Sequence, residues 1–429
     1  MLKYTQAYTM FKDMIADGRL RRGDRMPSIR RAAELYRISR TTVQNAYFQL
    51  AAEGYIYAKP QSGYFVAGGP NTALPRLPLP QAEAPLRFDL TGNSADLTSF
   101  DFSLWQRYIK SALRQRQRLL TYSQPQGEYD LRCALADYVR ERRNVVTTPE
   151  HIVVGAGVQM LLEILCVLLK QRRTVSFPDH SFVQGSTVFA AHGYTVHTRD
   201  KNADIIYVSP SHMNRQGDVM PIQRRLELCA HSAKTGAVVI EDDFENDFLY
   251  NSTPTPSLYA LGSGNVVYMG AFSALLLPGI RISFMVLSPE LATAYQTIKD
   301  TFAQTASKTE QIALCAYLRD GNMKTRTKKI RRLYTGKAKT LCTLLAQALP
   351  THAVSVGENG LQVCIETDTP PADRSLARAG IALYTAEEKN GKYSVIVSPS
   401  AIPVHQLEAA AKAVASLLSA EEKQEKPQQ

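Results

Sequence analysis

Apolar positions recur at helical spacing near the start of the chain and then change to the alternation that is typical of strands. Three segments each carry one apolar face and predict helices: residues 4–16, 28–36 and 39–53. Ser28 and Ser39 open the second and third segments, where a side-chain oxygen can cap the first turn of a helix. Residues 55–58 and 64–66 then alternate around the polar segment 59–63, which predicts a hairpin.

From about residue 88 the pattern changes to short apolar runs separated by longer amphipathic stretches. The runs predict buried strands at residues 174–177, 205–208, 237–240, 266–269 and 283–286. Several of the intervening stretches are long enough for crossover helices, so the sheet should be largely parallel. After about residue 328 the pattern predicts a smaller α+β lobe, which ends in an amphipathic helix over residues 406–418. The body is therefore expected to be an α/β domain with a smaller C-terminal lobe.

Three helices followed by a hairpin make a winged helix-turn-helix, an α+β arrangement that reads DNA with its third helix. The N-terminal end of that helix meets base edges in this docking geometry, and here it carries donors. Arg40 can make a bidentate contact to guanine, and Gln44 can read adenine or a phosphate. Gly63 lets the hairpin backbone approach a groove or a phosphate closely. The alternative is that Arg30 and Arg40 only solvate a surface.

Proline recurs through residues 68–86 without apolar periodicity, so this segment should be a semi-extended linker. Such a linker would let the DNA reader sit away from its own body or lie across a partner subunit. The predicted domain boundaries are 1–67 for the winged helix, 68–87 for the linker, 88–327 for the large domain, 328–419 for the small lobe and 420–429 for a flexible tail.

Positive charge is concentrated at the N-terminus. The chain of 429 residues has a formal net charge of +11, and residues 1–66 supply +6 of it through eleven Lys/Arg and five Asp/Glu. A basic terminal module on a nearly neutral body favours a nucleic-acid partner. The sequence contains no apolar run of membrane-spanning length, no secretory signal and no Cys-x-x-Cys pair among its six cysteines. We therefore expect a cytoplasmic DNA-binding protein without a metal site.

Four ordered motifs stand in the N-terminal segment: Met26-Pro27-Ser28-Ile29-Arg30, Ser39-Arg40-Thr41-Thr42-Val43, Ala46-Tyr47-x-x-Leu50-x-x-Glu53-Gly54 and Ser62-Gly63-Tyr64-Phe65-Val66. Together they resemble the DNA-binding domain of the GntR family of transcription regulators. The resemblance implies DNA contacts at Arg30, Ser39, Arg40, Thr41, Gln44 and Gly63.

Five further landmarks follow in the body: Tyr122-Ser-Gln-Pro-Gln-Gly127, Gly155-Ala-Gly-Val-Gln159, Pro210-Ser-His-Met213, Glu241-Asp-Asp-Phe244 and Gly270 to Arg281. With the N-terminal module they resemble the MocR subgroup of GntR regulators, which carry a body like that of fold-type I pyridoxal-phosphate (PLP) enzymes. The resemblance implies a fold-type I body, a head-to-tail homodimer, double-stranded operator DNA as partner and a small-molecule effector.

The resemblance also assigns roles in a cofactor pocket. Asp242 would keep the pyridine nitrogen protonated, and Phe182 would pack on the ring face. Ser273 and Arg281 would hold the phosphate. Ala274 stands at the position of the Schiff-base lysine, and an alanine has no amine with which to bond an aldehyde carbon. The alternative for Asp242 is a carboxylate that only closes the end of a strand.

Other pocket positions also depart from the family pattern. Phe244 replaces the tyrosine that bonds the ring oxygen, Val158 replaces a hydroxyl residue of the phosphate turn, and Met213 replaces a glutamine. Residues 393–400 lack the arginine that would hold an amino-acid carboxylate. We therefore interpret Ala274 as natural degeneration, and we expect no covalent cofactor and at most noncovalent PLP.

The alternative is a lysine replaced by alanine in the laboratory, which would make the chain a PLP-responsive regulator or an aminotransferase. Three functions are therefore compared: a transcription regulator with a dimerising and effector-sensing body, a PLP-dependent aminotransferase with an accessory DNA-binding domain, and an architectural DNA-binding dimer without an effector. We favour the first, a regulator that is not an enzyme, because the DNA-reading residues are intact whereas the residues for catalysis are missing.

Overall fold

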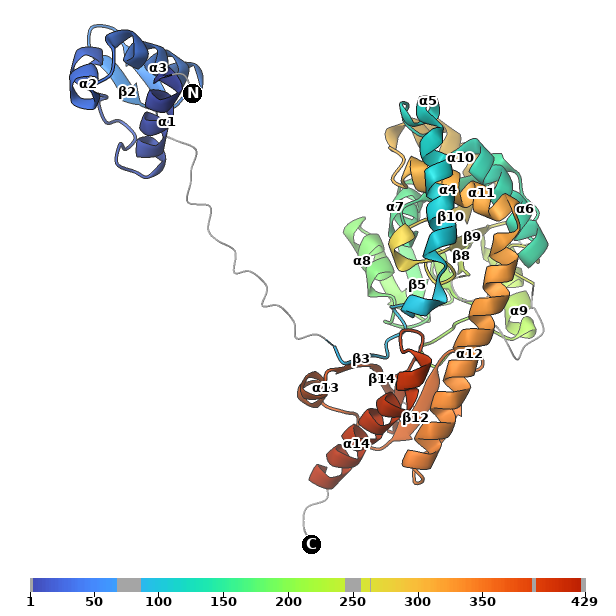
Figure 1. The fold of residues 1–429 in the computed structure, drawn as a ribbon. Coiled ribbons are helices and arrows are strands. Elements are labelled where there is room, and N and C mark those ends of the chain that lie inside the picture. The colour runs from blue at the N-terminus through green and yellow to red at the C-terminus, as the bar shows by residue number, and fades with distance from the viewer. Residues whose placement is uncertain (1–2, 68–85, 244–255, 263, 388–390, 426–429) are drawn as a thin grey trace. The chain divides into compact units, whose positions relative to one another are not determined.

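The computed structural model describes residues 3–67, 86–243, 256–262, 264–387 and 391–425. The chain divides into two compact units, Met1–Glu83 and Ala84–Gln429, which are described separately below (Figure 1). The larger unit is called the body.

The N-terminal unit has the three helices and the hairpin that the apolar pattern predicts. The elements are α1 Lys3–Ala16, α2 Ile29–Tyr36, α3 Arg40–Ala52, β1 Ile56–Lys59 and β2 Gly63–Val66, with the two strands antiparallel. Phe11 and Tyr47 are fully buried, and their rings meet edge to face with centroids 5.2 Å apart. The Tyr47 hydroxyl donates to the carbonyl of Pro27 at 2.9 Å, which ties α3 to the turn before α2. This core fixes which face of α3 remains outside.

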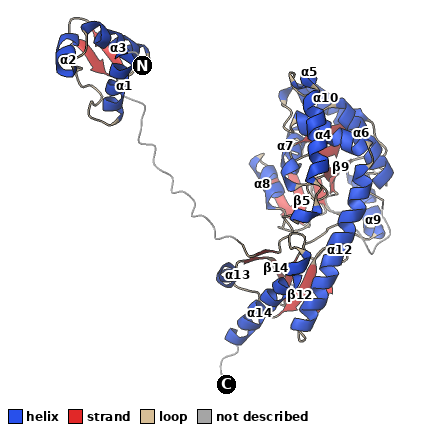
Figure 2. Cartoon of the chain, viewed as in Figure 1, coloured by secondary structure: helices blue, strands red, loops and turns tan. Residues whose placement is uncertain are grey.

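A seven-stranded mixed sheet forms the centre of the body (Figure 2). Its strands are β4 Ile152–Gly155, β5 Thr174–Phe177, β6 Thr195–Thr198, β7 Ile205–Val208, β8 Val238–Asp242, β9 Val266–Ala271 and β10 Ser283–Val286, in the order β4-β10-β9-β8-β7-β5-β6. The neighbours pair in parallel except at β10, which runs antiparallel to both β4 and β9. The sheet is therefore largely parallel, as predicted, with one reversed strand.

Helices cover both faces of this sheet: α4 Phe102–Arg114, α5 Arg116–Leu119, α6 Tyr129–Arg143, α7 Val158–Leu168, α8 Val183–Ala191, α9 Ile222–Thr235, α10 Pro289–Ile298 and α11 Lys308–Arg319. Successive strand residues point to opposite faces, so Val154 joins the core shared with α6 and α11 whereas Val153 joins the core shared with α7 and α8. The loops at the strand ends lie between these two covered faces and carry the pocket residues.

The smaller lobe packs helices against a four-stranded antiparallel sheet of order β11-β12-β15-β14. Its elements are α12 Asn322–Ala348, β11 Val354–Val356, β12 Val363–Thr367, α13 Asp373–Ala379, β13 Ile381–Ala382, β14 Tyr384–Glu387, β15 Tyr393–Val397 and α14 Leu407–Glu425.

Two features of the smaller lobe add to the boundaries that the sequence predicts. The strand β3, Phe88–Asp89, pairs in parallel with β13, and Phe88 and Leu90 belong to the core of the small lobe. The first residues after the predicted linker therefore pack there. Helix α14 continues to Glu425, so part of the segment expected to be a flexible tail is helical. The rest of that tail and residues 68–85 lie outside the described residues.

Candidate functional site

The outer face of α3 is set by its cap and its buried face. The Ser39 hydroxyl accepts a hydrogen bond from the Thr42 amide at 3.1 Å, as expected of an N-cap. The opposite, buried face consists of the residues predicted to point inward: Val43, Ala46, Tyr47 and Leu50. Arg40, Thr41 and Gln44 are consequently exposed on the side away from the core. The first turn of α3 thus presents donors to solvent, as a DNA-reading helix requires.

The other predicted contacts are exposed as well. Arg30 makes an exposed ion pair with Glu34 one turn further along α2, at 3.2 Å. Gly63 has φ = +99°, a backbone conformation that favours glycine. A Cβ built at Gly63 would stand 3.8 Å from the guanidinium of the exposed Arg25. Because the two are this close, Arg25 adds a positive charge beside the hairpin tip.

A basic residue of the hairpin itself adds to this charge. The ammonium group of Lys59 lies 4.8 Å from the ring centroid of Phe65. Neither Arg25, which precedes α2, nor Lys59, which pairs with Gly63 in the hairpin, is among the DNA contacts predicted from the sequence, although a basic residue within the predicted hairpin was a usable signal for Lys59. The N-terminal unit therefore offers a charged wing beside the donor-bearing helix.

The first part of the cofactor-like pocket is the turn before α7. Gly157 is the N-cap of α7 with φ = +91° and without a side-chain cap, so the free amides of the helix end remain available. The guanidinium of Arg281 lies so close to Gly157 that no Cβ would fit between them. Val158 is the first residue of α7 and supplies no hydroxyl. A helix N-terminus beside a guanidinium is suited to a phosphate.

A neighbouring hydroxyl already uses one amide of this turn. Thr305 accepts a hydrogen bond from the Ala156 amide at 2.9 Å through its Oγ1. This contact joins residues far apart in the chain, so nothing in the local sequence announces it. It fixes the turn that Arg281 covers.

Asp242 ends β8, where the family pattern expects the partner of the pyridine nitrogen. The buried Tyr207 donates a hydrogen bond from its hydroxyl to Oδ2 of Asp242. Burial, and then the nearby charge of Asp242, raises the pKa of Tyr207 well above its ordinary value, so the phenol stays protonated and remains a donor. Ser209 donates to the main-chain carbonyl of Asp242 at 2.9 Å. Asp242 is thus held in place from β7 and the residues after it.

Asp243, the next residue, belongs to a buried ion pair. Arg143 contacts its carboxylate through Nε at 2.7 Å and Nη2 at 3.1 Å, and both side chains are almost fully buried. Tyr268 donates to Asp243 at 2.7 Å, and Ser211 donates at 3.1 Å. Asp243 therefore holds three elements together, which is a structural role that its adjacency to Asp242 does not predict.

Glu241 precedes these two residues and is fully buried. Its carboxylate accepts hydrogen bonds from the amides of Leu258 and Tyr259 at 2.9 and 3.0 Å. Burial, and then the charge of Asp243, raises the pKa of Glu241 to about 7. The fold therefore favours the protonated form of this carboxyl group more than water does.

Phe182 lies at the start of α8, and its ring packs against Gly185 of that helix. The Phe182 ring is tilted against Tyr207 with centroids 5.3 Å apart. Tyr207 therefore contacts both Phe182 and Asp242, the two residues expected to touch a pyridine ring. Phe244, the remaining predicted ring contact, lies outside the described residues.

Ala274 and Ser273 are half-buried in the turn after β9. The next two residues are fixed by Arg326 of α12, which donates to the carbonyl of Leu275 at 2.8 Å and to that of Leu276 at 3.3 Å. The sequence has no lysine between Lys234 and Lys299. The turn is therefore well held, but it offers no amine.

Another lysine of the body is buried but committed to a different contact. The ammonium group of Lys337 lies 2.6 Å from Oδ2 of Asp96 and donates to the carbonyl of Ser400 at 3.1 Å. Asp242 beside Tyr207 and Arg281 beside Gly157 are groups of the kind that hold the ring nitrogen and the phosphate of PLP, whereas Ala274 offers no amine for its covalent attachment.

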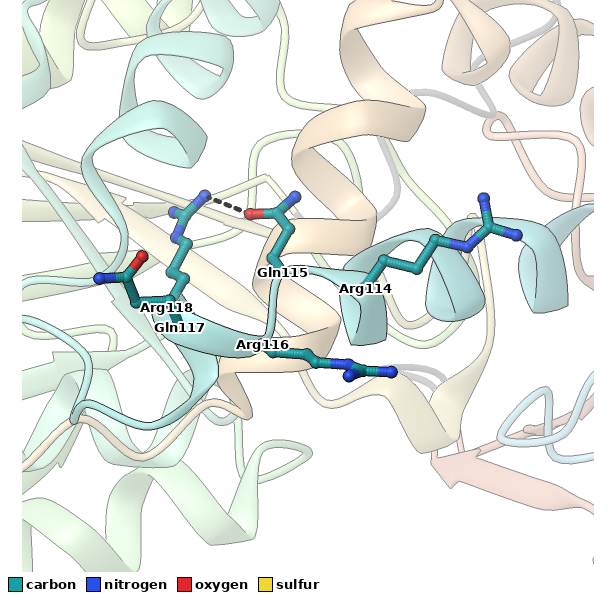
Figure 3. Close-up of a pocket in the computed structure, with 5 residues that line it drawn as sticks. All are labelled: Arg114, Gln115, Arg116, Gln117 and Arg118. Atoms are coloured by element: carbon teal, nitrogen blue, oxygen red, sulfur yellow. Dashed lines mark hydrogen bonds between the residues drawn. The ribbon is translucent and has the colours of Figure 1, made fainter.

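An open surface hollow belongs to different elements of the body. It is lined by Arg114, Gln115, Arg116, Gln117 and Arg118 at the junction of α4 and α5 (Figure 3). Arg118 donates to Gln115 at 3.3 Å and forms ion pairs with Glu128 and Asp130. This hollow is a basic surface, and neither Asp242 nor Ala274 lines it.

The described residues contain neither a metal site nor a membrane-spanning helix. No group of His, Cys, Asp and Glu there is placed to hold a metal ion. None of the helices in the same part of the chain has the length and apolar character needed to cross a bilayer.

Comparison with known proteins identifies both units. The model of bacterial regulatory proteins of the gntR family matches residues 3–66, and that of aminotransferase class I and II matches residues 92–389. The uncharacterized HTH-type transcriptional regulator YhdI of Bacillus subtilis (strain 168) is 34% identical, over 89% of this chain and 87% of its own. The probable rhizopine catabolism regulatory protein MocR of Rhizobium meliloti is 28% identical, over 88% of this chain and 84% of its own.

Solved structures agree with the fold of the body. An archaeal alanine:glyoxylate aminotransferase superposes with a TM-score of 0.70 at 20% identity, covering 79% of this chain and 92% of its own. A likeness at this identity carries the fold only. The two matched domains and the full-length relatives together show that the chain belongs to the MocR subgroup of GntR-family regulators, in which a winged helix-turn-helix is joined to an aminotransferase class I/II domain.

Proposed function

We propose that this protein is a DNA-binding transcription regulator whose aminotransferase-like body dimerises and senses an effector without transaminase activity and without covalent PLP. The observation that carries the proposal is the first turn of α3, where Arg40, Thr41 and Gln44 are exposed beside the Ser39 cap. A DNA-reading protein acts where the chromosome is, which for a bacterial regulator is the cytoplasm.

In this proposal each exposed group of the N-terminal unit has a task on DNA. Arg40 and Gln44 read base edges in the major groove, and Thr41 and Arg30 contact phosphates. Gly63 brings the hairpin backbone to the duplex, and the Arg25 guanidinium beside it supplies charge. Relatives named as HTH-type regulators support this assignment.

The body is proposed to be non-catalytic because two required groups are missing. Ala274 provides no nucleophilic amine, and β15, Tyr393–Val397, provides no guanidinium for an amino-acid carboxylate. The supported Asp242 and the turn beneath Arg281 favour a phosphorylated ring compound as a noncovalent effector. Such an effector would act by binding one conformer of the body better than another.

A second copy of the chain is the proposed partner of the body. Leu113, Leu120 and Tyr122 are exposed apolar or aromatic side chains around the α4–α5 junction, and Tyr122 is fully exposed. We infer that these exposed side chains form part of the contact with the second copy. Substitution Leu120→Glu should shift the protein to monomers in sedimentation experiments, and an unchanged dimer would place the interface elsewhere.

The DNA function is tested by capture from fragmented genomic DNA. The full-length protein should enrich a small set of duplex fragments that share a sequence. Failure to enrich any shared sequence would overturn the proposal that the protein is a sequence-specific transcription regulator.

The state of the pocket is tested by adding PLP to the protein. We expect a rise of the unfolding temperature without the visible absorbance band of a protonated imine. An imine band that survives dialysis would show covalent attachment, and transaminase turnover would show an enzyme.

A further inference from the structure

Helix α12 carries an unusual amount of positive charge. It contains eight lysine or arginine residues and no acidic residue over its 27 positions. Figure 1 shows it as a single long helix that runs along the body beside α14. Like charges that lie three or four positions apart on a helix repel one another and destabilise it unless anionic groups lie nearby.

Two of the eight basic residues are turned inward and used by the fold. Arg326 is buried and donates to the carbonyls of Leu275 and Leu276, and Lys337 is buried against Asp96. These contacts fix the rotation of α12 about its own axis. The opposite side of the helix is therefore held toward solvent.

Three residues on that outer side define what we call the α12 basic face: Lys328, Lys329 and Arg332. All three are exposed, and within the described parts of the chain they have no acidic partner at ion-pair distance. Lys324, one turn earlier, is exposed and forms an ion pair with Glu141 at 2.9 Å. The carboxylate of Glu141 therefore neutralises Lys324 and not a residue of the α12 basic face. The three charges remain available for an external anion.

The shape of this face fits a rod of regularly spaced negative charges. Lys328 and Arg332 are one helical turn apart, which separates them by about 6 Å along the axis. The exposed Lys339 continues the line, so Lys328 to Lys339 spans about 16 Å. A duplex carries on the order of ten phosphates over that length of its axis.

An anionic membrane is a poorer partner for the same face. A helix that lies on a bilayer inserts an apolar face between the lipids. Ile330, Ala338 and Leu341 of α12 are fully buried in the body, and Leu333 and Leu344 are partly buried against its apolar cores. The uncharged exposed positions beside the face are polar or small, namely Thr325, Gly336 and Thr340.

We propose that the α12 basic face binds the phosphate backbone of double-stranded DNA next to the sequence read by the winged helix. This inference rests on the proposed function, because the winged helix brings the duplex to the body. Residues 68–85 are 18 residues long and can span at most about 60 Å, roughly 18 base pairs of duplex. The body therefore acts on DNA near the site and supplies affinity without sequence preference.

The test is the salt dependence of DNA binding by the full-length protein. The variant Lys328→Gln/Lys329→Gln/Arg332→Gln and the wild type are titrated onto a duplex of about 60 base pairs over a series of salt concentrations. Each lost phosphate contact lowers the slope of log affinity against log salt by about 0.9, so the slope should fall by roughly 2 to 3. Circular dichroism and the unfolding temperature should not change, because the three side chains are exposed.

The matched control removes the same charge elsewhere on the body, at the exposed Lys170, Lys201 and Lys234, each changed to Gln. This control should keep the wild-type slope. An unchanged slope in the α12 variant, or an equal fall in both variants, would overturn the inference. Loss of binding to phosphatidylserine vesicles with an unchanged DNA slope would also overturn it, in favour of a membrane. If the wild type binds no duplex at all, the proposed regulator itself fails.

Discussion

At the scale of single residues, the role of Ala274 is inferred from the residues that hold its turn and from the candidate ring site. The turn that holds it is fixed by Arg326, and the carboxylate opposite the ring site, Asp242, is supported by Tyr207. These supports are what an intact ring site needs, whereas the amine for a covalent bond is missing. In the proposed function this site therefore binds its ligand without a covalent bond and catalyses no transamination.

The variant Ala274→Lys tests this view. Restoring the amine should allow the visible imine band to form with PLP, because Asp242 and Arg281 remain, but it should not give transaminase turnover. The reason is that no arginine of β15 can hold the amino-acid carboxylate. The readouts are absorbance after addition of PLP and keto-acid production from a panel of amino acids. Turnover above that of Ala274→Met would contradict the account.

At the scale of elements, the caps and inner faces of the N-terminal helices are local features that the sequence predicts. Ser28 and Ser39 both cap as expected, with hydrogen bonds to the Arg31 and Thr42 amides. An N-cap bond contributes about 1 kcal/mol to helix stability. The start of α3, where the proposed DNA contacts lie, depends on one of these bonds.

We expect Ser39→Ala to lower the free energy of unfolding of the N-terminal unit by about 1 kcal/mol. The variant Ser39→Asp keeps a side-chain acceptor and should retain most of the wild-type stability. Chemical denaturation, followed by the circular dichroism of the N-terminal unit, measures both. Equal stability of Ser39→Ala and wild type would show that the cap bond contributes nothing.

Strands are predictable only where their apolar runs are long enough. The runs at 174–177, 205–208 and 283–286 correspond to β5, β7 and β10 residue for residue. By contrast β6, Thr195–Thr198, is a largely exposed edge strand with a single valine, so its pattern carries little signal. The reversed direction of β10 is also hidden, because an apolar run reads the same in either direction.

The residues of the candidate cofactor site also divide into those that the sequence predicts and those that it does not. Asp242, Phe182 and Arg281 were predicted from motifs, and the structure brings Asp242 and Phe182 to Tyr207 and brings Arg281 to Gly157. Their supports were missed because each lies far away in the chain. Arg143 is 100 positions from Asp243, and no local pattern connects them.

At the scale of the whole molecule, the body buries titratable groups whose protonation contributes to stability. Glu241 has a pKa of about 7 in the fold against an ordinary value of 4.5, because it is buried and lies near Asp243. Between these two values the folded state binds more protons than the unfolded state. The contribution of Glu241 to stability is therefore full below pH 4.5 and is lost as the pH rises through 7.

The variant Glu241→Gln cannot titrate and should lose this part of the pH dependence. We expect the unfolding temperature of the body to fall less steeply between pH 5 and 8 than in the wild type. The exposed Glu141→Gln should keep the wild-type slope. Identical slopes in Glu241→Gln and wild type would contradict the role of this carboxyl group.

The proposed regulator depends on sequence reading by α3, and one measurement tests that property most directly. The affinity of wild type and Arg40→Ala is measured for a captured sequence and for its scrambled version, with the exposed Arg19→Ala as control. Arg40→Ala should reduce the discrimination between the two duplexes by about 1–3 kcal/mol, roughly 5- to 140-fold, whereas Arg19→Ala should leave it unchanged. Full discrimination retained by Arg40→Ala would contradict the assignment of α3 as the element that reads DNA.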